Sequence, residues 1–267
     1  MDLGLKSKVA LVTGASRGIG AAIAERLREE GCRLALIARD ERQLQQFAAG
    51  LAGSHADEVL VLAGDVTSAA HIDTAVATTL HRFGRVDIAV NNAGGAESFA
   101  AFDDLTDDQF RRTWELNFLS AVRVIRAVLP TMRENKWGRI SNISSESATQ
   151  PDALAADYNC AKGALNTLTK TLSKAYAAEG VLVNTVSPAF TLTPLLRTFI
   201  ENAAAAQSVS FDEAQAALLK SFRPHIEVKR PGKPEEVAAA VAFLASHLAG
   251  FINGTNLRVD GGSVASV

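Results

Sequence analysis

The sequence has few of the features that mark disulfide-rich, metal-binding or membrane-spanning proteins. It contains only two cysteines, Cys32 and Cys160, which excludes a framework of several disulfides. Its five histidines are scattered without the spacing of metal ligands, which argues against a zinc site. No apolar run reaches the roughly 18 residues of a membrane-spanning helix. We therefore expect no metal centre and no membrane span.

An excess of charge of one sign is also absent. Lys and Arg number 27 and Asp and Glu number 29, so the formal net charge is −2. This balance provides no basic surface for a nucleic acid or an anionic membrane. The N-terminus lacks the apolar segment and small-residue cleavage site of a signal peptide. We expect a cytoplasmic protein that binds neither nucleic acids nor membranes.

Short apolar runs alternate with longer helical patterns along the 267 residues. The strand-like runs cover residues 8–12, 34–38, 59–62, 86–90, 138–144, 181–187 and 256–259. The helical patterns cover residues 18–30, 41–52, 68–83, 106–133, 156–178 and 234–247. Near-continuous apolar strands separated by helices predict an α/β fold of the Rossmann type, with a doubly wound, seven-stranded parallel sheet and helices on both faces. Without a linker or a repeat, residues 1–267 are predicted to form a single domain.

A glycine-rich turn follows the first predicted strand. It reads TGASRGIG and contains Gly14, Gly18 and Gly20. A backbone that approaches a pyrophosphate must lack Cβ atoms, and the N-terminus of the following helix offers N–H donors. The turn could instead be only a tight connection, because its GxxxGxG spacing differs from the general GxGxxG fingerprint. Its position between the first strand and the first helix favours a dinucleotide site.

A second motif, YNCAK, places Tyr158 and Lys162 one turn apart on a predicted helix. The pKa of a free tyrosine is about 10, and a nearby ammonium group is expected to lower it. A tyrosine tuned in this way can donate a proton to a carbonyl oxygen or accept one from an alcohol. Taken alone, the pair could also be a tyrosine beside a lysine with no catalytic role.

Together, these motifs resemble the single-domain branch of the short-chain dehydrogenase/reductase family, and within it the 3-oxoacyl-(acyl carrier protein) reductases. The similarity runs almost from end to end and keeps the order of the motifs. It includes NNAG at 91–94, NISS at 142–145, NTVSPAFTLTP at 184–194 and LRVDGG at 257–262. The resemblance implies hydride transfer between a nicotinamide cofactor and a carbonyl compound or secondary alcohol.

The resemblance assigns catalytic roles to four residues. Ser145, thirteen residues before Tyr158, is expected to donate to the substrate carbonyl oxygen, with Ser144 as the competing candidate. Tyr158 is expected to protonate that oxygen, and Lys162 to hold the nicotinamide ribose as well. Asn117 interrupts an apolar helix, where the resemblance implies an opened backbone that holds a water; the alternative is a purely structural asparagine.

The resemblance also implies which residues contact the cofactor. They are Gly14, Ser16, Arg17, Gly18, Ile19, Gly20, Arg39, Asp65, Val66, Asn91, Ala93, Gly94, Tyr158, Lys162, Pro188, Thr191 and Thr193. Asp65 is expected to meet the adenine ring, unless it only introduces the next helix. Ala189 stands where the family usually has glycine, so the conformation of the loop around it does not follow from the resemblance.

The end of the second predicted strand bears on the choice between NAD and NADP. An acidic residue there binds the 2′-hydroxyl of NAD, whereas arginine accommodates the 2′-phosphate of NADP. This chain has Ala38 at that place, then Arg39, and it has Arg17 in the glycine-rich turn. Asp40 would favour NAD, but Asp40 and Gln43 fit the N-cap and N3 positions of a capping box. We therefore expect NADP, with NAD as the alternative.

Residues 190–229 form the longest insertion and carry many apolar side chains. Two amphipathic helices are expected to lie over the strand ends as a substrate lid, with Leu196 and Phe199 against the substrate. The alternative is that these side chains belong to the core. Ser98, Phe99 and Phe102 would form the opposite wall. No fixed charge is evident in this pocket, so we expect a small carbonyl or alcohol substrate of apolar or acyl type.

Three functions are open at this point. The first is an NADP-dependent carbonyl or 3-oxoacyl reductase, and the second is an NAD-dependent alcohol or sugar dehydrogenase. The third is a catalytically inactive NADP(H)-binding regulatory protein, which would not need to keep all four catalytic residue types.

The predicted helix over 106–133 is apolar on more than one face. By resemblance, it pairs with the helix over 158–178 across a two-fold axis, and the C-terminal strand builds a second contact. We therefore expect a homotetramer, or a dimer.

Overall fold

A parallel β-sheet forms the centre of the molecule. The computed structural model describes residues 1–52 and 56–266. The sheet has the strand order β3-β2-β1-β4-β5-β6-β7, and each neighbouring pair is parallel. The strands are β1 (Val9–Thr13), β2 (Arg33–Ala38), β3 (Val59–Ala63), β4 (Ile88–Asn91), β5 (Gly138–Ile143), β6 (Val181–Pro188) and β7 (Asn256–Val259). This confirms the seven-stranded Rossmann-type sheet that the apolar runs predict.

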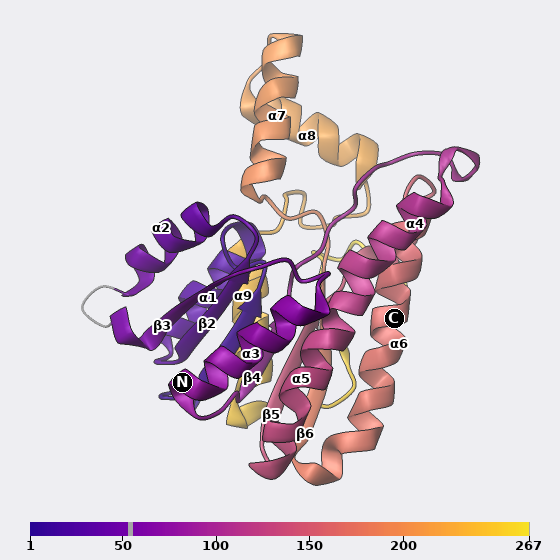
Figure 1. Cartoon of the computed structure of the whole chain (residues 1–267). Helices are drawn as coiled ribbons and strands as arrows, with labels where there is room; N and C mark the ends of the chain where they lie inside the picture. The colour runs from indigo at the N-terminus through magenta and orange to yellow at the C-terminus, as the bar shows by residue number, and fades with distance from the viewer. Residues whose placement is uncertain (53–55, 267) are drawn as a thin grey trace.

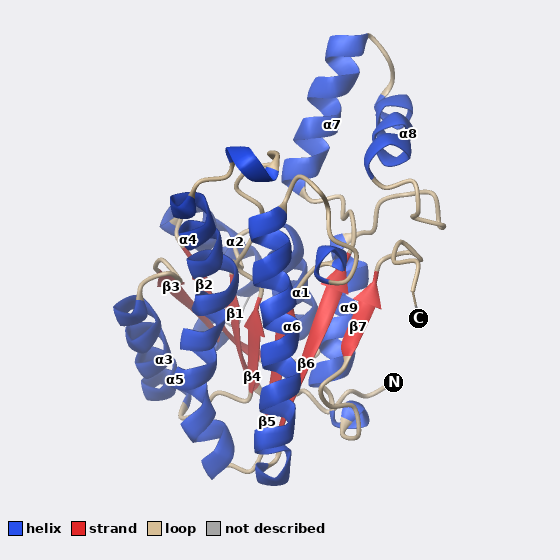
Figure 2. Ribbon diagram, turned by 90° about the vertical axis from the view of Figure 1, so that its right-hand side faces the viewer, coloured by secondary structure: helices blue, strands red, loops and turns tan. Residues whose placement is uncertain are grey.

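Helices cover both faces of the sheet, because alternate residues of each strand point to opposite sides. In β1, Ala10 and Val12 belong to one buried cluster and Leu11 to the other. The helices on the first side are α1 (Gly18–Glu29), α2 (Glu41–Ala52) and α9 (Pro234–Ala245). Those on the second side are α3 (Ala69–Phe83), α5 (Ser120–Glu134) and α6 (Ala156–Tyr176). Figures 1 and 2 show the sheet between these two layers.

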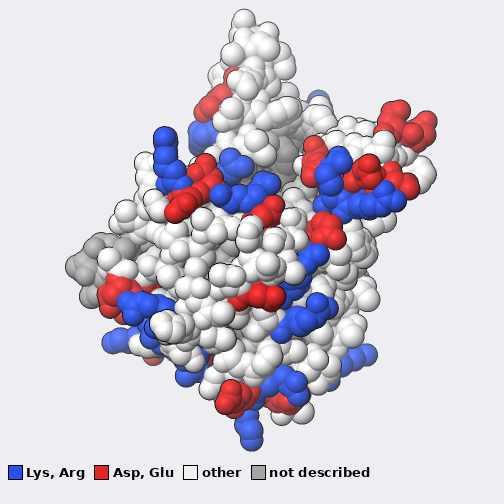
Figure 3. All heavy atoms as spheres, in the orientation of Figure 1, with Lys and Arg blue, Asp and Glu red and all other residues white. Residues whose placement is uncertain are grey.

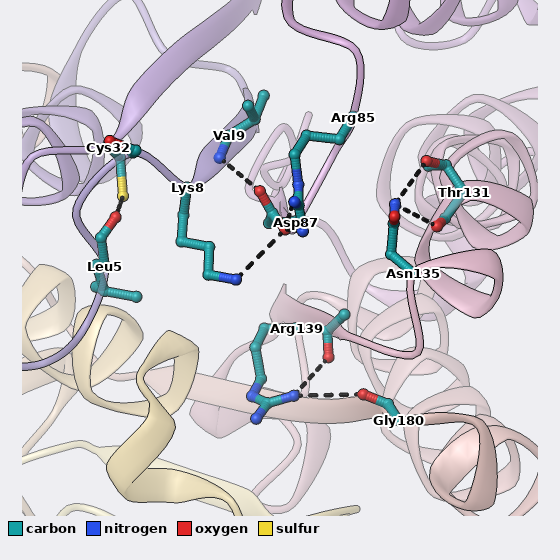
Figure 4. A network of polar contacts seen from close by, with 12 residues as sticks. Leu5, Lys8, Val9, Cys32, Arg85, Asp87, Thr131, Asn135, Arg139 and Gly180 are labelled. Atoms are coloured by element: carbon teal, nitrogen blue, oxygen red, sulfur yellow. Dashed lines mark hydrogen bonds and ion pairs between the residues drawn. The ribbon is translucent and has the colours of Figure 1, made fainter.

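A buried carboxylate fixes β4 beside β1 at the amino-terminal edge of the sheet. Asp87 accepts a hydrogen bond of 2.9 Å from the backbone N–H of Val9 and one of 2.8 Å from Nε of Arg85. Lys8 Nζ lies 3.7 Å from the same carboxylate (Figure 4). The strand order reverses between β1 and β4. Ligands bind at the carboxyl ends of strands that flank such a reversal, so this pairing positions the candidate site.

The helix predicted over 106–133 changes its winding part-way along. It consists of α4 (Asp107–Trp114), a π-helical turn (Glu115–Leu119) and α5. The π-helical turn is centred on Asn117, the residue that interrupts the apolar sequence pattern. A π-helical turn inside a longer helix is frequently part of a functional site.

The insertion forms two helices, α7 (Pro194–Gln207) and α8 (Phe211–Phe222), as predicted. Both project beyond the carboxyl edge of the sheet, as Figures 1 and 2 show. They do so because they bury apolar side chains mainly against each other, in a small cluster built on Ile200, Ala204 and Ala214.

Charge on the surface is mixed. On the face drawn in Figure 3, the side chains of Lys and Arg are interspersed with those of Asp and Glu. Within residues 1–52 and 56–266, no helix combines the length and the apolar character needed to cross a bilayer. Nor does any group of three or more His, Cys, Asp or Glu side chains among these described residues come together to hold a metal ion.

Candidate active site

The turn between β1 and α1 leaves no room for side chains at two of its glycines. Gly14 has a φ of +65°, and a Cβ atom there would lie 2.9 Å from Nδ2 of Asn92. A Cβ atom on Gly20 would lie 2.2 Å from the carbonyl oxygen of Gly14. Asn92 holds the turn in place, because its Nδ2 donates to the carbonyl oxygens of Thr13 at 2.9 Å and Gly14 at 3.2 Å. The turn is therefore packed too tightly for side chains at these two positions, as is typical of a phosphate cradle at a helix N-terminus.

A cleft of about 480 Å³ runs from this turn along the carboxyl ends of the strands. The structure brings most of the predicted site residues together in its lining. These are Gly14, Ser16, Arg17, Gly18, Ile19, Gly20, Arg39, Val66, Ala93, Gly94, Ser145, Tyr158, Lys162, Pro188 and Thr193. Further lining residues that the sequence reasoning did not propose as contacts include Ala38, Gln43, Gly64, Asn92, Leu116, Ile143 and Leu195.

Four predicted residues are not part of this lining. Asn91 is buried and donates through Nδ2 to Oδ1 of Asn142 at 2.8 Å, so its side chain joins β4 to β5. Thr191 donates to the carbonyl oxygen of Ala189 at 3.0 Å, and its side chain therefore braces its own loop. Asp65 accepts a hydrogen bond of 2.9 Å from the N–H of Thr67. Burial would raise the pKa of Asp65, but hydrogen bonds from Thr67 and the charge of Arg39 lower it overall.

The fourth of these residues, Asn117, lies behind the cleft. Its Nδ2 donates to the carbonyl oxygens of Gly95 and Thr113, both at 3.0 Å, and its Oδ1 accepts from the N–H of Gly95 at 2.9 Å. A Cβ atom on Gly94 would lie 2.7 Å from Oδ1 of Asn117 and 3.1 Å from Nζ of Lys162. The glycine of NNAG therefore allows Asn117 and Lys162 to approach each other from two different helices.

Two arginines lie at the end of the cleft near β2. Arg17 and Arg39 are exposed and line the cleft, and Ala38 precedes Arg39 at the end of the strand. Asp40 accepts a hydrogen bond of 2.9 Å from the N–H of Gln43, which confirms it as the N-cap of α2. Among the described residues, the reciprocal bond from the backbone N–H of Asp40 to the side chain of Gln43 is not formed, so the predicted capping box is only half present. Asp40 also lines the cleft, so this end presents two guanidinium groups and one carboxylate that caps α2.

At the other end of the cleft, Lys162 and Tyr158 face each other across one turn of α6. Nζ of Lys162 lies 5.6 Å from the centroid of the Tyr158 ring and donates to the carbonyl oxygen of Ile143 at 2.8 Å. Burial lowers the pKa of Lys162 to about 8.

Burial also raises the pKa of Tyr158, and a hydrogen bond with Ser145 only partly opposes this effect. The sequence analysis expected a lowered pKa for Tyr158, whereas burial raises it in this structure. The loss of solvation outweighs the neighbouring charge, and the phenol keeps its proton at neutral pH.

The two candidate serines have different surroundings. Ser144 is buried, and its Oγ donates to the carbonyl oxygen of Lys162 at 3.3 Å. Ser145 lies close enough to Tyr158 to oppose the rise of its pKa, and its Oγ accepts from the N–H of Ser147 at 3.1 Å. Because Ser145 is the serine that meets Tyr158, the geometry favours it over Ser144 as the group that contacts a carbonyl oxygen.

The structure does not place the residues expected to contact the substrate in the lining of the cleft. Leu196 packs inside the small α7–α8 cluster, and Leu195, which is 74% exposed, lines the cleft in its place. Phe199 is 52% exposed and does not line the cleft, and neither do residues 98–102. Thr193 caps α7 and Pro194 begins it, and this start directs Leu195 to the cleft.

A buried charge pair that the sequence analysis did not anticipate lies beside the site, outside the lining of the cleft. Glu146, which directly follows Ser145, is 4% exposed and forms an ion pair with Arg223 from the end of α8. Neither residue belongs to a motif, and 77 positions separate them in the sequence. The sequence alone gives no signal for this pair.

Comparisons with known proteins show the family to which the chain belongs. The family described as enoyl-(acyl carrier protein) reductase matches residues 14–264. A 3-oxoacyl-[acyl-carrier-protein] reductase of Vibrio cholerae is 36% identical over 260 residues, which cover 97% of this chain and 98% of that protein.

Two solved structures are similar over nearly the whole chain. L-sorbose reductase from Gluconobacter frateurii, complexed with NADPH and L-sorbose, has a TM-score of 0.94 and 33% identity, with full coverage of both chains. A 3-ketoacyl-(acyl-carrier-protein) reductase from Brucella melitensis, complexed with NADH, has a TM-score of 0.83 and 32% identity over 97% of this chain and 99% of that chain. The protein belongs to the short-chain dehydrogenase/reductase family and is an oxidoreductase.

Proposed function

We propose that the protein is an NADP(H)-dependent reductase of a ketone substrate, which oxidises the corresponding secondary alcohol in the reverse direction. The observation that carries this proposal is the convergence of Ser145, Tyr158 and Lys162 at one end of a cleft whose other end presents Arg17 and Arg39. A regulatory protein that only binds the cofactor would not need the first group. The described residues would act as one catalytic domain, with α7 and α8 as its substrate lid.

The residues fit the proposed cofactor by their shape and charge. Gly14 and Gly20 have no room for a Cβ atom, which leaves backbone N–H groups for the pyrophosphate. Arg17 and Arg39 suit the 2′-phosphate of the adenosine ribose, and Lys162 would bind the nicotinamide ribose. NADPH supplies a hydride to the carbonyl carbon when it is bound. Asp65 would lie close to the adenine, as its neighbours Gly64 and Val66 line the cleft.

The side chains of this protein would handle the carbonyl oxygen. Ser145 donates a hydrogen bond to that oxygen and stabilises its developing negative charge. Tyr158 transfers the phenolic proton to it; burial raises the pKa of Tyr158 and so keeps this proton in place at neutral pH. The ammonium group of Lys162 then stabilises the phenolate. The π-helical turn at Asn117 would hold a water through which the proton is restored.

Two types of ketone are candidate substrates. Leu195 presents an apolar side chain to the cleft, which favours an apolar or acyl ketone. The lining also includes polar side chains, among them Asn92, Ser144 and Thr193, which favour a ketone that carries hydroxyl groups. The similarity to a reductase complexed with L-sorbose supports the second candidate, and the similarity to 3-oxoacyl reductases supports the first.

We also propose that the protein is a homotetramer, with a dimer as the alternative. Trp114 and Phe118 stack with ring centroids 4.6 Å apart on the surface of the α4–α5 helix, and Trp114 is 37% exposed. Near the start of β7, Phe251 is fully exposed. Exposed aromatic side chains on two separate surfaces suit two contacts between subunits. A monomeric mass by light scattering at micromolar concentration would contradict this proposal.

Oxidation of NADPH, followed with a panel of substrates, tests the proposed function. The panel pairs 3-oxoacyl thioesters and apolar ketones with ketoses, and each is assayed with NADPH and with NADH. Turnover of one class with a clear preference for NADPH supports the proposal. A preference for NADH favours the alternative of an NAD-dependent alcohol or sugar dehydrogenase. Tight NADPH binding without turnover of any class favours the regulatory alternative.

A further inference from the structure

An ion-pair cluster joins the end of α8 to the loop between Ser145 and Tyr158. Arg223 follows the last residue of α8, and its Nε donates to Oε1 of Glu146 at 2.6 Å. Its Nη1 donates to Oδ2 of Asp152 at 3.1 Å. One guanidinium group thus binds two carboxylates that lie on the same loop.

Each of the two acidic residues is linked to a different catalytic residue through the chain or through one neighbour. Glu146 is the chain neighbour of Ser145. Asp152 is tied to Asn159, the chain neighbour of Tyr158, because Nδ2 of Asn159 donates to the carbonyl oxygen of Asp152 at 2.7 Å. Through these two contacts, Arg223 holds the start of the segment that separates Ser145 from Tyr158, at Glu146, and its middle, at Asp152.

The chemistry of the cluster requires arginine. The carboxylate of Glu146 is almost completely buried, and within the described part of the chain its Oε2 has no hydrogen-bond partner. A buried charge in this position needs a partner, and Arg223 supplies it. Lysine has a single ammonium group on a flexible stem and cannot reproduce the fork that reaches Glu146 and Asp152 in two directions.

The cluster also anchors the projecting helices. The α7–α8 pair packs mainly on its own small cluster beyond the sheet (Figures 1 and 2), and Arg223 joins its end to the catalytic loop. We propose that Arg223 is a positioning residue that sets the spacing of Ser145 and Tyr158 and couples it to the seating of the α7–α8 lid. This inference rests on the proposed reductase function.

Arg223→Met is the variant that tests the proposal. Arg133→Met is its matched control, because Nε of Arg133 also donates to a glutamate, Glu179, at 2.7 Å, but at the amino-terminal edge of the sheet. We expect Arg223→Met to lower kcat at least ~10-fold, as misplaced catalytic groups do, with the Kd for NADPH within about twofold of wild type. Arg223→Lys should fall between wild type and Arg223→Met. Arg133→Met should match wild type.

A pH profile separates positioning from a general loss of stability. Four groups act on Tyr158: Lys162 across one turn of α6, Ser145 through a hydrogen bond, and the charges of Glu146 and Arg223. The charge of Glu146 raises the pKa of Tyr158 and that of Arg223 lowers it. Ketone reduction needs the protonated form of Tyr158, so the rate falls at high pH when Tyr158 loses its proton. In Arg223→Met, this fall in the pH–rate profile should move to higher pH. Adding Glu146→Gln should move it back and restore part of kcat.

Amide hydrogen exchange gives a readout that does not depend on activity. Arg223→Met should exchange faster than wild type in residues 146–155 and in α8, whereas Arg133→Met should not. If wild type reduces a ketone but Arg223→Met behaves like Arg133→Met in kcat, pH profile and exchange, the proposal is overturned. If wild type reduces no substrate, the proposed function fails, and exchange alone decides whether Arg223 holds the loop.

Discussion

The ammonium nitrogen of Lys162 donates a hydrogen bond of 2.8 Å to the carbonyl oxygen of Ile143, the last residue of β5. The lysine is therefore fixed to the end of a strand and lies beside the tyrosine rather than bonded to it. This bond places the ammonium group in the floor of the cleft, close to Gly94 and Asn117. Its burial and its surroundings lead to the first two predictions.

The space between Asn117 and Lys162 makes Gly94 sensitive to substitution. The Cβ atom of Gly94→Ala would lie 2.7 Å from Oδ1 of Asn117, so the asparagine or the lysine must shift. We expect kcat to fall at least ~10-fold, because displacement of catalytic groups by about 1 Å has large effects on rate. Gly50→Ala is the control: nothing lies within 4 Å of its added Cβ, and it should keep wild-type kcat while stabilising α2. Equal activities of the two variants would contradict the prediction.

The buried ammonium group makes stability depend on pH. Because burial lowers the pKa of Lys162 from 10.5 to about 8, the unfolded chain binds more protons than the folded protein between these pH values. The free energy of unfolding should therefore rise with pH across this window, by up to about 2 kcal/mol from this group. Urea unfolding of wild type and Lys162→Met at pH 7.5 and pH 10 measures the contribution. The same pH dependence in both proteins would show that Lys162 does not titrate as described.

The cofactor preference depends on Arg39 in the proposed function. Arg39→Asp replaces a group that attracts the 2′-phosphate with one that repels it and can accept a hydrogen bond from a 2′-hydroxyl. The Kd for NADPH should rise at least ~10-fold while that for NADH falls, since the exchange reverses a charge-assisted contact. Titration of both cofactors by fluorescence decides the matter. A wild-type protein that binds NADH more tightly than NADPH would contradict the account of this end of the cleft.

Adjacent leucines at the start of α7 should have different effects. Leu195→Ala removes an exposed apolar side chain from the cleft and should lower kcat/KM for a bulky ketone more than for a small one. Leu196→Ala removes a contact of the small α7–α8 cluster and should lower the Tm instead. Kinetics on two ketones of different size and thermal melting separate the two effects. If instead Leu195→Ala lowered the Tm and Leu196→Ala changed kcat/KM for the bulky ketone, Leu196 and not Leu195 would lie against the substrate.

The fold and most of the cleft could be predicted from the sequence because their signals are local. Near-continuous apolar runs predict buried parallel strands, and glycines at fixed spacing predict the tight turn after β1. The interruption at Asn117 also appears in the sequence as a polar residue in an apolar helix. It corresponds to the π-helical turn of the structure.

The parts that could not be predicted depend on contacts between distant segments. Asn91 and Asn92 are adjacent in one motif, yet one side chain faces the neighbouring strand and the other faces the glycine-rich turn. The pKa of Tyr158 depends on burial, which arises only when the whole site is assembled. Arg223 reaches a loop 77 residues away, and no periodicity or motif marks that contact.

Transfer of deuterium from NADPH labelled at the nicotinamide C4, in wild type and in Tyr158→Phe, tests the central claim most directly. The account predicts that wild type places the label on the carbinol carbon of the product. Tyr158→Phe keeps the aromatic ring but lacks the proton donor, so its rate should fall at least ~10²-fold while the Kd for NADPH stays within about twofold. A Tyr158→Phe protein that reduces the ketone at nearly the wild-type rate would contradict the account, as would an alcohol product without the label.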